Sequence, residues 1–261
     1  MVSLVRALIA VFALLTLVSA TAGLWVYNSH ISPLKALASK PSIADVLDLV
    51  ESMRYTMEFD GEVWIVNIYN DPGRRSGVIE VYSAGYGQPI AVYEYNYTRT
   101  TLTWLTVTRE GNRTLLNPLD YNEAFATNLK FTQAEDGTVK SVEPFPGIAP
   151  LYALTYIGNA TLVDWSTFYS IRGDRSPPQW VYIAFAKVRV EGGEARGVEV
   201  VIEPQPTPLT AYFKWYNVGV HAMVAAMSRI AVAWELTLTM TKPTGEQLEV
   251  RIKLENLKLR T

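Results

Sequence analysis

The feature that most constrains this chain is a run of 21 residues without charge, from Ala7 to Tyr27, close to its N-terminus. Arg6 is the only charged residue among the first 34. A helix rises about 1.5 Å per residue, so this run reaches about 30 Å and can cross the hydrocarbon core of a bilayer. Trp25 and Tyr27 stand where aromatic side chains anchor a span at the membrane surface. The run predicts a transmembrane or signal helix over residues 1–28.

The same residues also have the layout of a secretory signal peptide. Arg6 gives the basic start, residues 7–18 give the apolar core, and Ala20-Thr21-Ala22 gives the small-x-small pattern of a cleavage site. Retention of the helix is favoured because the apolar run continues through residues 23–27, beyond that site. We therefore expect a single-pass protein of the cell membrane with an extracytoplasmic body, or a secreted protein if the chain is cut after Ala22.

A third interpretation rests on the sequence VRALIAVF, in which Arg6-Ala7 directly precedes Leu8 and an unbroken apolar segment. This arrangement resembles the class III leaders of archaeal type IV pilins, although the acidic residue found early in many pilin helices has no counterpart here. The resemblance implies that a peptidase cuts before the helix and that the subunit keeps the helix as its assembly core. A structural subunit of a surface filament or coat is therefore an alternative function.

The composition excludes several kinds of site. The chain has no cysteine, and therefore no disulfide framework, thiolate metal site or cysteine nucleophile. Its net charge of −2 provides no basic field for nucleic acid. The motifs of nucleotide-binding loops, serine hydrolases and zinc proteases are absent from the sequence. We expect no cofactor, no metal and no nucleic acid; the expected partners are the membrane, through the N-terminal helix, and a protein, lipid or glycan.

Catalysis could rest only on scattered residues. His221 lies in an apolar stretch, far from His30. Two turns carry close carboxylates: Glu58, Asp60 and Glu62, and then Glu191 and Glu194. Carboxylates beside a hairpin turn usually face water, and a histidine in an apolar stretch is more often packed than catalytic. A carboxylate- or His-dependent hydrolase is the least favoured function, and we assign no catalytic residue.

Residues 42–53, SIADVLDLVESM, predict a soluble helix. Ser42 and Asp45 have the spacing of a capping box, which satisfies free amide groups at a helix N-terminus. An apolar stripe at helical spacing follows and is expected to pack against the rest of the fold. The stripe consists of Ile43, Val46, Leu47, Val50 and Met53.

After residue 55 most apolar residues recur at every second position, which predicts strands. Asp60-Gly61 marks a hairpin turn between two of them. In residues 234–259 the alternation is close to strict, which predicts an antiparallel sheet with one dry face and one solvated face. Residues 215–233 suit a helix or a strand equally well. Short helices or ordered loops are expected in residues 119–131, 144–158 and 163–178.

Together these patterns indicate an α+β fold that is mainly antiparallel β: an N-terminal transmembrane or signal helix, then a large curved antiparallel sheet with a few packed helices. The expected division is a signal-anchor or signal peptide at 1–28, a membrane-proximal stalk at 29–41 and an extracytoplasmic β-rich domain at 42–261. Two small β domains divided near residue 145 are the alternative. Lys35 and Lys40 in the stalk nearly balance Arg6 and the terminal amine, so the positive-inside rule leaves the orientation open.

Tyr93, Tyr95 and Tyr97 alternate along one predicted strand and therefore share a face, close to Trp104 on the next strand. A row of tyrosines can hold a glycan, a lipid or a partner protein, so these four residues are the candidate ligand-binding residues. The alternative, which we favour, is that they line the core and stack beside Trp104, because aromatic side chains usually find their partners in the interior.

Three sequons, at Asn96, Asn112 and Asn159, are candidate glycosylation sites. They agree with a location outside the cytosol. The function that best fits all of these features is a membrane-tethered extracytoplasmic module without catalytic activity. It would hold an apolar ligand, a glycan or a protein partner on its sheet.

Overall fold

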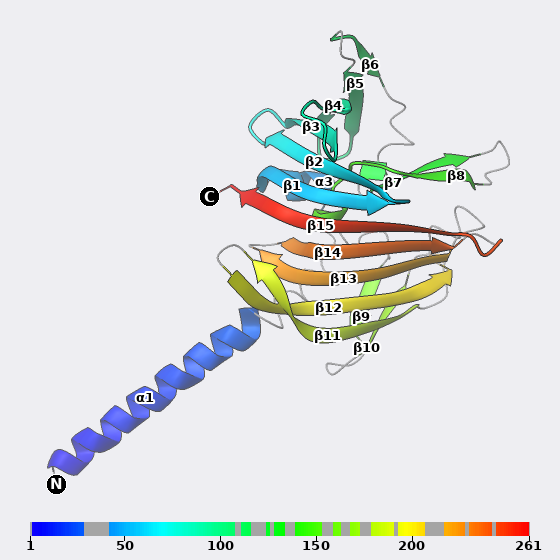
Figure 1. Cartoon of the computed structure of the whole chain (residues 1–261). Coiled ribbons are helices and arrows are strands. Elements are labelled where there is room, and N and C mark those ends of the chain that lie inside the picture. Colours follow the sequence, from blue (N-terminus) through cyan, green and yellow to red (C-terminus); the bar gives the residue numbers. More distant parts are fainter. Residues whose placement is uncertain are drawn as a thin grey trace.

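The main body of the protein is one large antiparallel sheet, and the chain begins with a long helix (Figure 1). The prediction of a mainly antiparallel β chain with few helices and an N-terminal apolar helix is confirmed. The computed structural model describes residues 2–28, 42–107, 111–115, 124–125, 128–133, 139–152, 159–162, 168–172, 179–190, 193–206, 217–227, 230–241 and 244–260. The predicted stalk, residues 29–41, lies outside the described residues.

Helix α1, Val2–Val26, carries the predicted apolar run. Its segment Leu8–Val26 has a mean hydropathy of 2.2, and none of this segment is buried. Thr16 and Thr21 satisfy their hydroxyl groups by donating to carbonyls one turn earlier in the same helix. Because its apolar side chains are exposed, α1 is not part of the sheet's core. It has the length and composition of a membrane anchor or a signal sequence.

Helix α3, Ile43–Leu47, begins at the predicted capping box, in which the Asp45 amide donates to the Ser42 hydroxyl and the Ser42 amide donates to the Asp45 carboxylate, both at 3.1 Å. The predicted extension of this helix to residue 53 is wrong. Val50 and Met53 lie instead on strand β1, Val50–Phe59, which pairs with a strand on each side. Both side chains are buried on the strand, just as a helix would have buried them.

The sheet contains 13 described strands in the order β6-β5-β4-β3-β2-β1-β15-β14-β13-β12-β11-β10-β9. Asp60 and Gly61 form the predicted hairpin turn between β1 and β2, with φ angles of 47° and 77°. The strands between β1 and one edge of the sheet are β2 (Glu62–Asp71), β3 (Ser76–Ser83), β4 (Ala91–Tyr97), β5 (Leu102–Val107) and β6 (Arg113–Leu115).

The other half of the sheet comes from the C-terminal part of the chain. Its last strand, β15, pairs with β1, so the first and last described strands meet in the interior of the sheet. The strands of this half are β9 (Asn159–Leu162), β10 (Phe168–Arg172), β11 (Gln179–Val190), β12 (Gly193–Pro206), β13 (Asn217–Met227), β14 (Ile230–Thr241) and β15 (Gln247–Leu259).

The middle of the chain is less helical than its sequence suggests. Phe168–Arg172, which we expected in a short helix or loop, is strand β10, because it pairs with β11 on one side and with β9 on the other. A separate two-stranded sheet is formed by β7 (Leu129–Gln133) and β8 (Val139–Pro144). Helix α5, Ala149–Tyr152, contains Pro150 in its first turn, as predicted. Where residues 215–233 are described, they are strands β13 and β14.

The segment before α5 is fixed to the sheet by one buried asparagine. Asn128 has no exposed surface and a φ of 57°. Its amide group donates to the Tyr55 hydroxyl at 2.8 Å, and its side-chain oxygen accepts from the Ala149 amide at 2.6 Å. The Tyr55 hydroxyl in turn donates to the Gly147 carbonyl at 2.7 Å. Asn128 therefore joins strand β1 to the start of α5 through buried hydrogen bonds.

Gly77 on β3 leaves the space that the Tyr95 ring occupies. It lies opposite Tyr95 on β4, and a Cβ atom at residue 77 would collide with the Tyr95 ring and hydroxyl. That hydroxyl donates to the Asn70 side chain at 3.0 Å, and Asn70 donates to the carbonyls of Leu47 at 2.7 Å and Val50 at 2.9 Å. The tyrosine lying over the glycine therefore links β4 to the end of α3.

Replacing Gly77 with alanine is expected to lower the free energy of unfolding by about 1–3 kcal/mol, because the Tyr95 ring must move out of a packed position. Chemical denaturation measures the loss. In a Tyr95→Leu background the same substitution should cost less than about 0.5 kcal/mol, since the obstructing ring is gone. An equal cost in both backgrounds would show that the ring is not the reason for the glycine.

Candidate functional site: the outer face of β2 to β6

The strands of the sheet differ in how regularly hydrophobic residues alternate. In β15, and in β14 from Glu235 onward, apolar and polar residues alternate, and the buried positions are the apolar ones. In β2 and β5, by contrast, apolar residues occupy neighbouring positions, as in Val63-Trp64-Ile65-Val66 and Trp104-Leu105. Successive side chains of a strand point to opposite faces. Strands β2 to β5 therefore present apolar side chains on both faces, which is typical of a sheet covered on both sides.

The register of the strands brings the outward apolar side chains together. One row across the sheet contains Tyr69, Val78, Glu94, Leu105 and Leu115 at directly opposed positions. The next row contains Val92 and Val107, and the row beyond it contains Ile65 and Tyr82. We define the outer apolar patch as Val63, Ile65, Tyr69, Val78, Tyr82, Val92, Leu105, Val107 and Leu115.

Several members of the outer apolar patch are well exposed. Leu115 is 61% exposed, Tyr69 51% and Val63 37%. The other six are partly exposed, as expected for side chains that shield one another on neighbouring strands. Large apolar side chains that gather on one exposed face commonly mark an interaction surface.

The carboxylates among these side chains have partners. Glu94 accepts two hydrogen bonds from the Arg113 guanidinium, at 2.8 and 2.9 Å. These hydrogen bonds hold the pKa of the Glu94 carboxyl below its usual range, so the pair stays ionised and compensated at neutral pH. Glu80 accepts a hydrogen bond from the Tyr82 hydroxyl at 2.9 Å. The Glu94 charge is therefore compensated by Arg113, whereas Glu80 keeps its negative charge, because a phenol donates a hydrogen bond and no positive charge.

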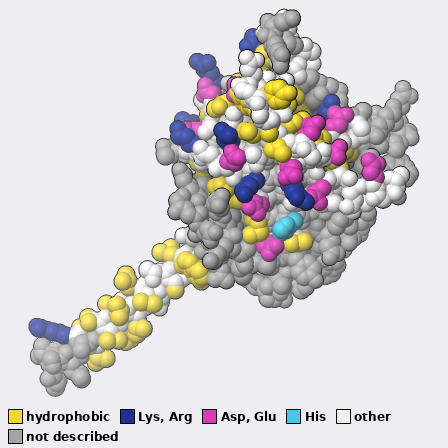
Figure 2. Space-filling view, viewed as in Figure 1, with side chains coloured by type: hydrophobic (Ala, Val, Ile, Leu, Met, Phe, Trp, Pro, Cys, Tyr) yellow, Lys and Arg dark blue, Asp and Glu magenta, His cyan; other side chains and the backbone are white. Residues whose placement is uncertain are grey.

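The same face of β1, β15, β14 and β13 is polar. Arg54 pairs with Glu255 at 2.7 Å, and His221 contacts Glu199 at 2.7 Å. Figure 2 shows this division: hydrophobic side chains gather where Figure 1 places β2 to β4, while most of the Lys, Arg, Asp and Glu side chains and the histidine lie below them. The solvated face is thus divided into an apolar half and a charged half.

A shallow hollow of about 410 Å³ adjoins the patch at its Tyr69 side. Tyr69, Val78 and Glu94 belong to its wall, and Asp71, Ser76 and Asn96 complete its polar side. The hollow is small and open, so it suits the side chain of a partner better than an enclosed small molecule.

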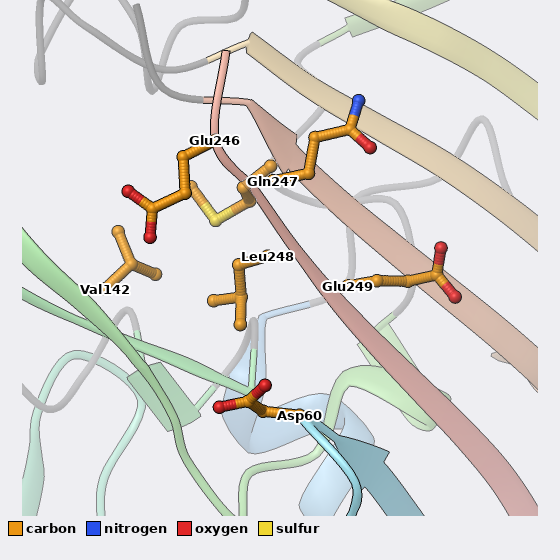
Figure 3. Close-up of a pocket in the computed structure, with 7 residues that line it drawn as sticks. Asp60, Val142, Glu246, Gln247, Leu248 and Glu249 are labelled. Carbon is orange, nitrogen blue, oxygen red and sulfur yellow. The ribbon is translucent and has the colours of Figure 1, made fainter. Parts of the chain in front are cut away.

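A second hollow, of about 350 Å³, lies at the opposite end of the strands, beside the β1–β2 and β14–β15 turns. Figure 3 shows Val142, Leu248, Asp60 and Glu246 on one side of the β15 ribbon and the Glu249 side chain on the other. The three carboxylates do not converge on one point, and in the described part of the chain no group of three or more His, Asp or Glu side chains could hold a metal ion. The arrangement provides neither a metal centre nor a carboxylate pair across a cleft.

The four candidate ligand-binding residues lie on the inner face of the sheet. Tyr95, Tyr97 and Trp104 are almost completely buried, and Tyr93 is partly buried against the core. Trp104 packs edge-on against Phe125, with 4.4 Å between ring centroids, and Tyr95 contacts both rings. A ligand on this row would have to replace these core contacts. The positions agree with the favoured alternative, in which the aromatic row is part of the core.

The three sequons fall on strands or next to them. Asn96 is exposed on β4 and Asn112 is exposed just before β6, whereas Asn159 begins β9 and its side chain is outside the described set. The Thr98 hydroxyl of the first sequon accepts from the Thr101 amide at 3.0 Å. Glycosylation at these positions stays a prediction.

The buried tyrosines predict a loss of stability at high pH. Burial raises the pKa of the Tyr97 phenol to about 12, and the hydrogen bond it donates to Asp48 at 3.1 Å adds to the rise. Burial also raises the pKa of Tyr55 and Tyr95. Between pH 10 and 12 the unfolded chain releases these protons before the folded chain does, so the free energy of unfolding should fall as pH rises. Chemical denaturation at a series of pH values measures how the free energy of unfolding changes with pH. Tyrosinate absorbance reports the ionisation of the tyrosines in the same samples.

Tyr97→Phe should flatten that slope between pH 10 and 12, because the variant lacks the phenol whose proton release differs between the two states. Tyr86→Phe is the control, since Tyr86 is 71% exposed and does not belong to the core cluster. A stability that stays constant from pH 9 to 12 would contradict the expectation.

No protein-family model, no curated protein and no solved structure matches the chain. The sequence pattern singled out the tyrosine row and did not predict the outer apolar patch. The available signal was the loss of alternation in β2 and β5, where residues of both faces are apolar.

Proposed function

We propose that the protein is a membrane-tethered extracytoplasmic module without catalytic activity, and that it holds a partner on the outer apolar patch of its sheet. The observation that carries the proposal is the outward row of apolar side chains on strands whose other face already forms the core. Burying such a row against a partner stabilises the complex by about 25 cal/mol per Å² of apolar surface removed from water, before the costs of association.

The tether is supported by α1, whose exposed apolar segment would otherwise face water along its whole length. Transfer of such a helix into lipid removes its apolar side chains from water, and its backbone groups are already hydrogen-bonded within the helix. The body then stays close to the membrane and presents its sheet to other molecules at that surface. The scattered His and carboxylate side chains supply no comparable support for hydrolysis.

Cysteine labelling tests both the location and the binding surface, because the chain contains no cysteine of its own. Leu115→Cys places one thiol on the patch, and Tyr86→Cys places one at a 71% exposed position away from it. Both are treated with a membrane-impermeant maleimide, on intact cells and after purification and dilution in detergent. We expect Tyr86→Cys to react at the same rate in both settings and Leu115→Cys to react at least about tenfold more slowly on cells.

The outcomes are separable. An unreactive Tyr86→Cys on intact cells would place the body on the cytoplasmic side and contradict the location. Equal rates for Leu115→Cys in the two settings would mean that nothing covers the patch, which contradicts the binding role.

A structural subunit of a surface filament is the second candidate, because α1 is continuous from Val2 through the residues that resemble a pilin leader. The intact mass of the native protein separates these possibilities. Loss of residues 1–7 supports the subunit, loss of residues 1–22 supports a secreted domain, and an uncleaved N-terminus in the membrane fraction supports the tethered module.

A further inference from the structure

We infer that the partner held on the outer apolar patch is a protein segment that places one cationic side chain, an arginine by preference, on the Glu80 carboxylate. This inference rests on the proposed function, because it states the chemistry of the occupant of the same surface. It follows from the position of Glu80 within the patch, from the absence of a described cation paired with it, and from the two tyrosines beside it.

Glu80 lies in the middle of the outer apolar patch. On its own strand, β3, Val78 and Tyr82 are two positions away on either side and therefore point to the same face. Across the sheet, Glu80 lies directly opposite Asn67 on β2 and Val92 on β4. Its side chain is only partly exposed. A partner that covers the patch therefore also covers this carboxylate.

The described cations nearest to Glu80 in its row across the sheet are bound to other carboxylates. Arg54 lies two strands away on β1, and it pairs with Glu255 at 2.7 Å. Arg113 lies three strands away on β6, and its guanidinium holds Glu94. An unpaired carboxylate that is covered by an apolar surface loses its hydration without compensation, which opposes binding. A cationic side chain on the partner removes this penalty.

Two tyrosines make the surroundings of Glu80 suitable for a guanidinium. The Tyr82 hydroxyl donates to one carboxylate oxygen at 2.9 Å and so holds the carboxylate in place, while no described group donates to the other oxygen. This hydrogen bond raises the pKa of the Tyr82 phenol, and the nearby Tyr69 phenol adds to the rise. The rings of both tyrosines can attract a cation through their faces. A guanidinium can donate to a carboxylate and stack on a ring at once, which favours arginine over lysine.

The remaining side chains of the patch favour a protein over a glycan or a lipid. All members except Tyr69 and Tyr82 are aliphatic, so a sugar would find few rings on which to stack. The acyl chains of a lipid would remove Glu80 from water without a hydrogen-bonding partner. A protein segment supplies apolar side chains and a cation together, and arginine is enriched in such interfaces.

The first test selects peptides from a phage-displayed library of short random sequences. The target is the full-length chain in nanodiscs of phosphatidylcholine, a lipid without net charge. Peptides selected on the unchanged protein should be enriched at least about tenfold in an arginine flanked by apolar residues. The enrichment should disappear on Glu80→Gln, which keeps an acceptor for the Tyr82 hydroxyl. It should persist on Glu235→Gln, which removes an exposed outward glutamate from the charged half.

The second test asks whether the selected arginine and Glu80 meet. Binding of one selected peptide is measured by fluorescence anisotropy, with the arginine kept or replaced by glutamine, to the unchanged protein and to Glu80→Gln. Each single replacement should weaken binding at least about tenfold, and the second should cost less than about threefold once the first is made. Additive losses, or no enrichment of arginine in the selection, would overturn the inference.

Labelling on cells separates this inference from the proposed function. Glu80→Lys, added to Leu115→Cys, should raise the rate of maleimide labelling on cells at least about fivefold, because it places a like charge against the partner's cation. Glu235→Lys is the matched control and should leave the rate unchanged. If Leu115→Cys stays protected in the Glu80→Lys protein, the patch is covered without a cation, and only the inference fails. If Leu115→Cys is unprotected even with Glu80 in place, the binding role itself fails.

Discussion

Replacing Leu14 and Leu17 with arginine is expected to abolish co-flotation of the purified full-length protein with lipid vesicles. Both side chains lie near the middle of the apolar segment of α1 and are exposed, at 64% and 63%. Each arginine at the centre of a span costs about 2.5–3.5 kcal/mol, so the pair costs about 5–7 kcal/mol. That corresponds to a loss of about 10⁴ in the partition coefficient.

Leu14→Met and Leu17→Met together form the control, because they keep the segment apolar and helical. The control should float with the vesicles as the unchanged protein does. If the arginine variant also floats, the protein attaches to lipid through another surface, and α1 is not its anchor. Circular dichroism of each variant verifies that the sheet is intact in both.

Replacing Asn128 with alanine is expected to lower the free energy of unfolding by about 3–5 kcal/mol. The substitution leaves the buried Ala149 amide without its acceptor and removes the hydrogen bond to the Tyr55 hydroxyl. A buried group without a partner costs about 1–3 kcal/mol. Alanine also tolerates a φ of 57° less well than asparagine, at a cost of about 1 kcal/mol. Denaturant titration of the full chain measures the total loss in the free energy of unfolding.

Two further variants separate these contributions. Asn128→Gly accepts the backbone conformation and should recover about 1 kcal/mol relative to Asn128→Ala. Tyr55→Phe removes only the hydroxyl and should cost less in the Asn128→Ala background than in the unchanged protein, because the two residues share one hydrogen bond. Strict additivity of the two substitutions would contradict the shared network.

Local patterns were sufficient for the features that depend on nearby residues. The apolar run predicted α1, the Ser42–Asp45 pair predicted the start of α3, and Asp60-Gly61 predicted the first hairpin. Each depends on interactions within a few residues, or on the contrast between lipid and water. The alternation in residues 234–259 likewise predicted the buried and exposed faces of β14 and β15.

The predictions failed where distant partners decide the conformation. Val50 and Met53 fit a helical stripe, but they lie on a strand that needs β15, about 200 residues later, as its neighbour. Residues 168–172 have no strong pattern of their own and become a strand by pairing with β11. The order of 13 strands cannot be derived from periodicity, since each strand would fit beside several others.

The residues of the candidate site likewise depend on partners that are distant in the sequence. The tyrosine row is conspicuous in the sequence, yet Tyr95 lies over Gly77 and is fixed by Asn70, a partner that spacing alone does not identify. The outward row that includes Leu105 and Leu115 becomes contiguous only when the register of β4, β5 and β6 is known.

The pairing of β1 with β15 has a consequence for biosynthesis. Strand β1 gains its second neighbour only when β15, about 200 residues further along the chain, has been synthesised, so β1 has one unpaired edge until then. A chain that lacks β15 would leave β1 unpaired on one side in the centre of the sheet, where it could pair with a strand of another molecule.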